Sequence, residues 1–498
     1  MSLHQLYVVL LAAGVVLLAS IVATRVATIV GLPSLLLFLA VGVVIGEDGM
    51  GLLFDDAQLA QTLGTAALGV ILVEGGLTTR FGDIKAVLRP AGALATVGVA
   101  VSTALTAAGA HFLLGLDWQL ALLLGATVSS TDAAAVFSVL RVVPLPRRLA
   151  GLLEAESGFN DAPAIILVML FSVTPLALAP GKILGSLVYE LSAGIAIGLA
   201  CGFAGAEALR RIALPASGLY PLATFALGMV AFAAAGAVHA SGFIAAYLAA
   251  VVLANSGLPH RSATRSFAEG AGWLAQISLF VLLGLLVSPD KLPGEIIPAI
   301  IIGLVLLLIG RPISVLVSLA GFRVPWREQV FLSWAGLRGA VPIVLATFPI
   351  VAGVPNSDRL LNIVFILVVV FTLIQGPSLP LVARTLGLIR RDAAQELQVE
   401  SAPLDVLGAE LLTLTVSPGS RLNNVSVREL RLPDPSVITL IIRDGHSFVP
   451  DQATHIAIGD ELLIVTTSKT RESAERRLRA VSRRGRLAYW FDEYGDAD

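Results

Sequence analysis

Four ionisable side chains lie in the middle of long apolar runs of this 498-residue sequence, namely Asp132, Glu156, Asp161 and Arg338. An ionisable side chain at the centre of a bilayer costs about 2.5–3.5 kcal/mol on insertion scales, so such residues are candidates for function. Arg338 needs an anionic partner in that environment, and Glu156 or one of the Asp residues must supply it. The four residues predict a polar site at one depth of a membrane.

A buried carboxylate of this kind can couple the movement of a cation to that of a proton. Burial favours the protonated carboxyl group, whereas a bound monovalent cation favours the carboxylate, so the group holds either the proton or the cation. Access from alternate sides of the membrane then produces exchange. Oxygen ligands suit hard cations, and Asp161, Asp132, Ser157 and Thr131 would supply them, together with backbone carbonyls freed where a helix unwinds.

The residues before Asp161 are spaced for one face of a helix. In the run ESGFND at 156–161, Glu156 precedes Asn160 by four positions, and Ser157 precedes Asp161 by four. Residues four apart lie one above the other on a helix. The two pairs are therefore expected to form adjacent polar stripes.

Two other apolar runs are interrupted by poor helix formers. Residues 118–140 carry VSSTD in the middle, and residues 327–350 carry AGLRG in the middle, followed by a proline. Ser and Thr compete for backbone hydrogen bonds, Gly adds backbone entropy and Pro removes a donor, so both helices are expected to unwind there. Interrupted helices at matching positions of two halves mark the site of many transporters. Small residues also allow close helix packing, but packing requires neither Asp132 nor Arg338.

The composition indicates an integral membrane protein. Hydrophobic residues make up 56% of the chain and charged residues 14%, and the mean hydropathy is +0.87, outside the usual range of soluble proteins. One cysteine, Cys201, excludes a disulfide framework, and six scattered His residues suggest no transition-metal site. A net charge of −2 offers no basic surface for nucleic acid. The first apolar run has no Lys or Arg before Arg25, so it is interpreted as a retained span and not as a signal peptide.

Thirteen apolar spans predict an all-α polytopic membrane protein with inverted repeats and discontinuous helices. Lys and Arg concentrate in alternate loops, with seventeen on one side, Arg311 among them, against Lys182, Lys291 and Arg359 on the other. Basic loops face the cytoplasm, so the N-terminus is expected outside and the C-terminal domain inside. The expected spans are 6–24, 29–46, 59–79, 90–114, 118–140, 146–173, 181–209, 219–237, 240–256, 268–288, 296–320, 327–350 and 360–388.

Three runs carry a resemblance to a known family. SSTDAAAVF at 129–137, ESGFND at 156–161 and WAGLRGAVPIVLA at 334–346 are similar to the monovalent cation/proton antiporters of the NhaP branch, within the sodium/proton exchanger superfamily. The resemblance covers residues 6–388. It implies a six-helix core that carries the crossing of the two interrupted helices, a dimerisation domain beside it, and exchange by movement of the core against the dimer interface.

The resemblance also implies roles for individual residues. Asp161 would be the exchanging carboxylate, and Asn160 would be its neighbour in the asparagine–aspartate pair of electroneutral members. Electrogenic relatives have a second Asp in place of Asn160. Thr131, Asp132 and Ser157 would help to ligate the cation.

A supporting polar core is implied beside these ligands. Glu156 would pair with Arg338 and hold Asn160 in place. Glu74 and Glu154, which lie nearer the inner ends of their helices, are interpreted as packing residues or as the lining of a cytoplasmic funnel.

The polar residues after the spans predict a small α/β domain. Residues 410–416 and 437–443 are rich in β-branched side chains, and residues 470–482 form a basic helical pattern. This region resembles the TrkA-C (RCK-C) module, which is typically dimeric and in relatives can bind a small effector such as cyclic di-AMP; a ligand-free dimerisation module is the alternative. The expected domains are a transmembrane exchanger domain at 1–390, a linker at 391–402, a TrkA-C regulatory domain at 403–485 and an acidic-aromatic tail at 486–498.

These observations predict a secondary transporter and not an enzyme. It would exchange a monovalent cation for a proton, without net charge movement, across the cytoplasmic membrane under control of the TrkA-C domain. K⁺ is favoured because a TrkA-C tail resembles the potassium/proton subgroup; Na⁺ is the alternative, since oxygen ligands alone do not discriminate between the two ions. The expected partners are the lipid bilayer, a second copy of the chain and a small-molecule effector, with no bound cofactor and no nucleic acid.

Two other classes of function are weaker. A tail-gated cation channel would need a filter of carbonyls or a ring of carboxylates, and the sequence has no TVGYG-like loop. An intramembrane aspartyl protease could use Asp132 and Asp161, but a Gly-x-Gly-Asp motif is missing and Asn160 and Arg338 would have no evident role.

Overall fold

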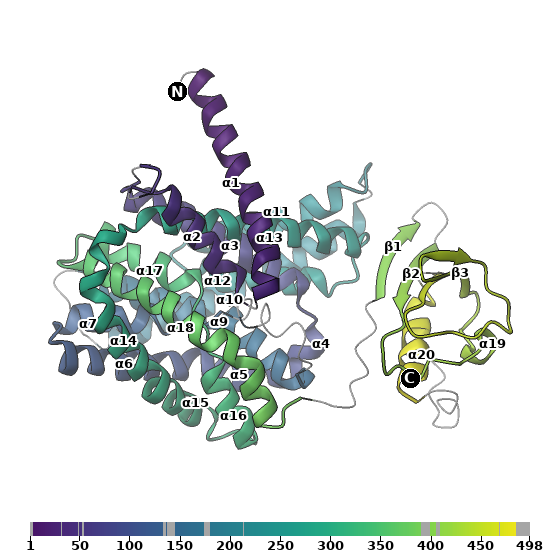
Figure 1. The fold of residues 1–498 in the computed structure, drawn as a ribbon. Helices are drawn as coiled ribbons and strands as arrows, with labels where there is room; N and C mark the ends of the chain where they lie inside the picture. The colour runs from purple at the N-terminus through teal and green to yellow at the C-terminus, as the bar shows by residue number, and fades with distance from the viewer. Residues whose placement is uncertain are drawn as a thin grey trace. The chain divides into compact units, whose positions relative to one another are not determined.

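The computed structural model describes residues 3–30, 32–47, 49–51, 54–132, 136, 145–173, 180–212, 214–389, 399–404, 409–467 and 469–484 (Figure 1). The chain divides into two compact units, Met1–Ile389 and Arg390–Asp498. The first is helical and the second contains a β-sheet. The predicted tail and most of the predicted linker lie outside the described residues, so the predicted domain boundaries stay predictions.

The helices of the first unit follow the apolar runs, and polar residues mark several of their ends. Asp56 and Asp117 accept hydrogen bonds from the amides of Leu59 and Leu120 and so cap the helices that follow them. The elements are α1 (Leu3–Val30), α2 (Ser34–Ile45), α3 (Ala57–Thr78), α4 (Phe81–Ile84), η1 (Lys85–Val87), α5 (Leu88–Ala93), η2 (Leu94–Gly98), α6 (Val99–Leu114), α7 (Trp118–Thr127), α9 (Arg147–Phe171), α10 (Pro180–Arg211), α11 (Leu219–Ala237), α12 (Gly242–Ala254), α13 (Arg261–Leu286), η3 (Pro289–Lys291), η4 (Pro293–Glu295), α14 (Ile296–Val305), η5 (Leu306–Gly310), α15 (Arg311–Leu319), α16 (Trp326–Trp334), α17 (Ala340–Val351) and α18 (Ser357–Thr385).

Each of the thirteen expected spans overlaps one helix or several consecutive helices of this unit. In the described part of the chain, eight helical stretches are long and apolar enough to cross a membrane, and α2, α7, α12 and α17 are shorter apolar helices. The polytopic helical fold is confirmed. The count of thirteen stays a prediction, because a helix of 10–13 residues is shorter than the bilayer core is thick.

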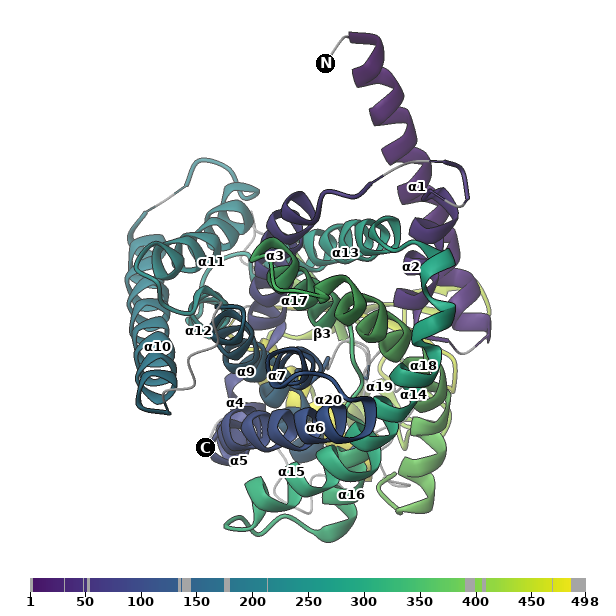
Figure 2. The same cartoon turned by 90° about the vertical axis from the view of Figure 1, so that its left-hand side faces the viewer.

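The helices pack in two groups, which the turned view separates (Figure 2). One group contains α1, α2, α3 and α10 to α13. The other contains α4 to α7, α9 and α14 to α18. Across the boundary between the groups, α3 contacts α9 and α17, α10 and α12 contact α9, and α13 contacts α17.

The expected unwinding is confirmed in both interrupted runs. Helix α7 ends at Thr127, and the chain is not helical from Val128 to Asp132. Helix α16 ends at Trp334, and α17 begins only at Ala340. Both breaks belong to the second group of helices.

The second unit contains a five-stranded antiparallel sheet in the order β1-β2-β5-β3-β4. Side chains such as Leu412, Ile464 and Leu478 form its core, with the helix α20 packed against the sheet. The strands and the basic helix expected here are confirmed. The elements are β1 (Val399–Leu404), β2 (Ala409–Thr415), α19 (Val427–Leu430), β3 (Val437–Arg443), β4 (His446–Phe448), β5 (Glu461–Thr467) and α20 (Arg471–Arg484).

Candidate functional site

The two helix breaks cross and bind each other through their backbones. The amide of Asp132 donates a hydrogen bond of 2.9 Å to the carbonyl oxygen of Leu337. The Asp132 carboxylate lies against Gly339, where a Cβ atom would collide with Oδ2. Each break therefore satisfies a backbone group that the other helix leaves unpaired, as a membrane interior requires.

Helix α9 presents its polar stripes to the first break. The hydroxyl of Ser130 donates to Oδ1 of Asp161 at 2.6 Å. The hydroxyl of Ser157 donates to the carbonyl oxygen of Thr131 at 2.8 Å, and Nδ2 of Asn160 donates to Oγ1 of Thr131 at 2.6 Å. The structure thus brings together the sequence-predicted residues of helix α9 and of the 128–132 break.

The group is buried and rich in oxygen atoms. Asp161 is 8% exposed, Thr131 7% and Asn160 1%. Carboxylate, hydroxyl and carbonyl oxygens are the ligands that hard cations prefer. A carboxylate in such surroundings can hold either a proton or a cation. In the described part of the chain, no three His, Cys, Asp or Glu residues form a group that could hold a metal ion.

Ser130 is a site residue that was not among the predicted ligands. It stands next to Thr131 in the same break, where helical periodicity no longer indicates which hydroxyl faces which neighbour. Its hydrogen bond with Asp161 shows that the carboxylate meets a hydroxyl group of the break.

The expected pairing of Glu156 with Arg338 is corrected by the structure. Glu156 forms its ion pair with Nη1 of Arg311 at 2.6 Å, and both side chains are at most 5% exposed. Arg311 was expected among the basic residues of the cytoplasmic loops, and this prediction is wrong, because its side chain is buried. Arg311 begins α15 directly after the π-helical turn η5, in the middle of a continuous apolar stretch. Its position inside the 296–320 span was the signal that could have identified it.

Arg338 lies in the second break, beside this pair. Its Nη1 donates to the carbonyl oxygen of Gly336 at 2.7 Å, and its own carbonyl oxygen accepts a hydrogen bond from Thr372 of α18 at 3.2 Å. Gln375 of the same helix donates to the carbonyl oxygen of Trp334 at 2.9 Å. Helix α18 thus holds both ends of the break.

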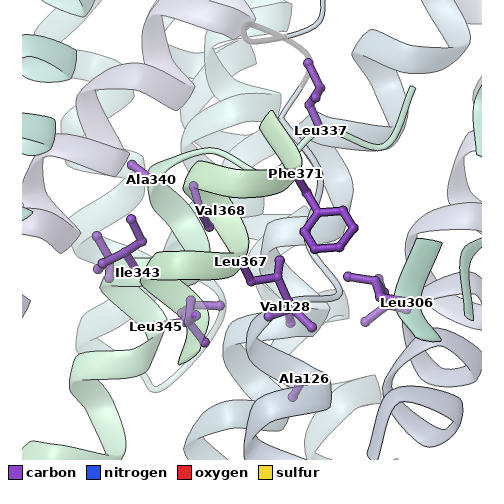
Figure 3. Close-up of a cluster of buried hydrophobic side chains, with 14 of the residues drawn as sticks. Ala126, Val128, Leu306, Leu337, Ala340, Ile343, Leu345, Leu367, Val368 and Phe371 are labelled. Atoms are coloured by element: carbon purple, nitrogen blue, oxygen red, sulfur yellow. The ribbon is translucent and has the colours of Figure 1, made fainter. Parts of the chain in front are cut away.

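Apolar side chains surround the crossing. Figure 3 shows Val128 and Leu337, one from each break, near Leu306 of η5 and Leu367 and Phe371 of α18. These side chains are buried. They keep water away from the polar groups, which strengthens every electrostatic interaction among them.

Glu154 lies on α9, at the boundary between the two groups of helices. It is hydrogen-bonded to the hydroxyl of Thr79, the residue that follows α3. Glu74 of α3 packs against Gly272 of α13. Neither residue contacts Asp161 by a hydrogen bond or ion pair in the described part of the chain, and their interpretation as packing or funnel-lining residues stays a prediction.

Comparison with protein families identifies both units. The sequence model described as "Sodium/hydrogen exchanger, transmembrane" matches residues 16–385, and the model of the TrkA-C domain matches residues 411–479. The solved structure of the sodium proton antiporter MjNhaP1 from Methanocaldococcus jannaschii is similar in fold, with a TM-score of 0.65 at 20% identity, over 77% of this chain and 99% of that one.

Several proteins named as cation/proton antiporters are similar in sequence to most of this chain. The K(+)/H(+) antiporter NhaP of Alkalimonas amylolytica is 35% identical over 466 residues, which cover 92% of this chain and 80% of the relative. The K(+)/H(+) antiporter NhaP2 of Shewanella baltica is 35% identical over 89% of this chain and 78% of the relative. The Na(+)/H(+) antiporter NhaS2 of Synechocystis is 29% identical over 64% of this chain and 61% of the relative. The chain therefore belongs to the sodium/hydrogen exchanger family of membrane transporters and carries a TrkA-C domain after its exchanger unit.

Proposed function

We propose that this protein exchanges a monovalent cation, K⁺ in preference to Na⁺, for a proton, without net movement of charge, under control of its TrkA-C domain. One observation carries the proposal: the buried carboxylate of Asp161 faces the hydroxyl of Ser130 at 2.6 Å, and its neighbour on α9 is the uncharged Asn160. A site with one exchanging carboxylate holds one monovalent cation or one proton, so the two loaded forms carry equal charge.

The cation would be bound by oxygen atoms of α9 and the first break. Asp161, Asp132, Thr131 and Ser157 supply carboxylate, hydroxyl and carbonyl oxygens. The hydrogen bonds that join Ser157 and Asn160 to Thr131 support this choice of ligands, because they hold the two segments together. No chemical conversion of a substrate is proposed, since the family transports ions.

Similarity to the named relatives favours K⁺. The relatives named as K(+)/H(+) antiporters match about nine-tenths of the chain, whereas the relative named as a Na(+)/H(+) antiporter matches 64% of it. The oxygen ligands do not discriminate between the two ions by themselves. Na⁺ exchange is therefore the second candidate.

We further propose the cytoplasmic membrane as the location, with the N-terminus outside and the C-terminal unit in the cytoplasm. The distribution of Lys and Arg between alternate loops supports this orientation, and the removal of Arg311 from the count leaves the bias in place. A homodimer in the bilayer and a small effector such as cyclic di-AMP at the TrkA-C domain follow from the resemblance alone.

The test is proton movement in proteoliposomes with the membrane potential clamped. A K⁺ jump should move protons through the wild-type protein at a rate independent of voltage, a Na⁺ jump should move fewer, and Asp161→Asn should be silent. A larger response to Na⁺ would replace K⁺ by Na⁺. Cation current without proton movement would replace the exchanger by the channel.

A further inference from the structure

Two buried arginines converge on one point in the second helix break. A Cβ atom on Gly336 would lie 2.9 Å from Nε of Arg311 and 3.1 Å from Nη1 of Arg338. Arg311 is 4% exposed and Arg338 3% exposed. Two guanidinium groups therefore approach each other in a region from which solvent is excluded.

The described residues supply one carboxylate for these two cations. Glu156 pairs with Arg311. Among those residues, the Arg338 guanidinium has one hydrogen bond, to the carbonyl oxygen of Gly336, and no carboxylate within ion-pair distance. The segment after Asp132 adds no carboxylate, because residues 133–144 contain neither Asp nor Glu. A buried charge without a counter-charge is strongly unfavourable.

Three N–H-bearing atoms at this place have no hydrogen-bond partner in the described structure: Nε and Nη2 of Arg311 and Nε of Arg338. A guanidinium only donates hydrogen bonds and accepts none. Both side chains line one small cavity, whose remaining wall includes Gln375, Leu306, Leu367 and Phe371. Figure 3 shows the last three side chains together with Leu337 of the break.

We propose that this cavity binds a small monovalent anion, such as chloride, between Arg311 and Arg338. The anion accepts the unpartnered N–H groups and neutralises the charge that Glu156 leaves uncompensated. The cavity has room for about one water-sized molecule, so the proposal is confined to a monatomic anion. It is a structural ligand that is not transported, and it fixes the break on which the crossing with Asp132 depends.

Bromide locates the site directly, because it replaces chloride and scatters X-rays anomalously. Crystals of the full chain grown in potassium bromide should give an anomalous peak within hydrogen-bonding distance of Nε of Arg338. A fully occupied water molecule there, with no anomalous signal, would overturn the proposal.

Thermal stability in detergent provides a second measurement that does not depend on transport. At constant K⁺, replacement of gluconate by chloride should raise the Tm of the wild type by about 2–4 °C, as a ligand bound only to the folded state does. Arg338→Gln removes the excess charge and should abolish this rise. Arg265→Gln, which removes an exposed arginine paired with Glu269, should retain it. An equal rise in Arg338→Gln, or none in the wild type, refutes the anion site, and the bromide peak decides the question if Arg338→Gln does not fold.

Discussion

The amide of Asp132 and the carbonyl oxygen of Leu337 form a hydrogen bond of 2.9 Å between two helices that are far apart in the sequence. Each partner belongs to a break, where a helix in a membrane would otherwise leave backbone groups unpaired. The bond places the Asp132 carboxylate against Gly339. The position of this proposed ligand is therefore set by the backbone of the opposite helix.

Gly339→Ala tests that dependence. The new methyl group would collide with Oδ2 of Asp132 and displace the carboxylate. We expect cation-driven proton movement in proteoliposomes to fall by about tenfold or more, which corresponds to about 1.4 kcal/mol. Gly92→Ala is the control, because a Cβ atom there meets no atom within 4 Å. Equal rates for the two variants would contradict the proposed contact.

The fold and the centre of the site are predictable from sequence because their signals are local. Ser, Thr, Gly and Pro reveal the two breaks, and the cost of ionisable residues in a membrane singles out Asp132 and Asp161. The partner of Glu156 is not local. Arg311 lies on α15, far from Glu156 along the chain, and no spacing along the chain encodes that these two side chains meet.

Asn160→Asp tests whether Asn160 acts as a hydrogen-bond donor. Its Nδ2 donates to Oγ1 of Thr131 at 2.6 Å, and a carboxylate cannot donate. The loss of a buried hydrogen bond costs about 1–3 kcal/mol, so we expect transport to fall by about tenfold or more. Thr131→Ser keeps the acceptor and should transport like the wild type. If Asn160→Asp is fully active and its transport depends on voltage, the charge of the side chain at position 160 matters for transport and its hydrogen bond to Thr131 does not.

A double-mutant cycle tests the corrected partner of Glu156. The breaking of a buried ion pair costs about 3–5 kcal/mol, because the remaining charge is left uncompensated. The free energies of unfolding of Glu156→Gln, Arg311→Gln and the double variant should give a coupling larger than the same cycle with Arg338→Gln. A coupling to Arg338 as large as that to Arg311 would contradict the ion pair of the structure.

Acid should loosen the C-terminal unit through Asp460. Burial raises the pKa of this carboxyl group, but hydrogen bonds from Arg443 at 2.7 Å and from the amide of Ala457 at 2.7 Å outweigh burial, so the pKa lies below its ordinary value. A lowered pKa contributes stability above the unfolded pKa of about 3.9, and this stability is lost as the pH falls through the folded pKa. The protection of residues 409–484 in the full chain, measured as the hydrogen-exchange rate relative to the intrinsic rate at the same pH, should therefore fall below about pH 4.

Asp460→Asn should lower the local stability of this unit by about 1–3 kcal/mol at pH 7 and so reduce its protection from exchange. The protection should also depend less on pH than in the wild type. Glu461→Gln is the control, since Glu461 is the exposed neighbour of Asp460. Unchanged exchange in Asp460→Asn at neutral pH would show that the Arg443 pair does not support the sheet.

The boundary between the two groups of helices carries a contact that exchange would have to break. Thr79, at the end of α3, is hydrogen-bonded to Glu154 of α9, and its hydroxyl lies 3.5 Å from that of Tyr247 on α12. The Tyr247 ring packs edge-on against Phe159 of α9, with 5.5 Å between ring centroids. Glu154 lies two helical turns, about 10 Å, from Asp161, toward the end of α9 expected to face the cytoplasm. If α9 moves against α3 and α12, this contact opens.

Cysteine pairs joined by a short bifunctional methanethiosulfonate test that movement in a Cys201→Ser background, which removes the one native thiol. Thr79→Cys with Glu154→Cys ties α3 to α9 across the boundary, so we expect cross-linking to stop proton movement and reduction to restore it. Thr79→Cys with Asn255→Cys is the matched control, because Asn255 of the α12 end donates to the carbonyl oxygen of Thr79 at 3.1 Å within one group. Comparison of each variant before and after cross-linking separates the effect of the tether from that of the substitutions. Undiminished exchange with α3 tethered to α9 would mean that the cation crosses without relative movement of the two groups.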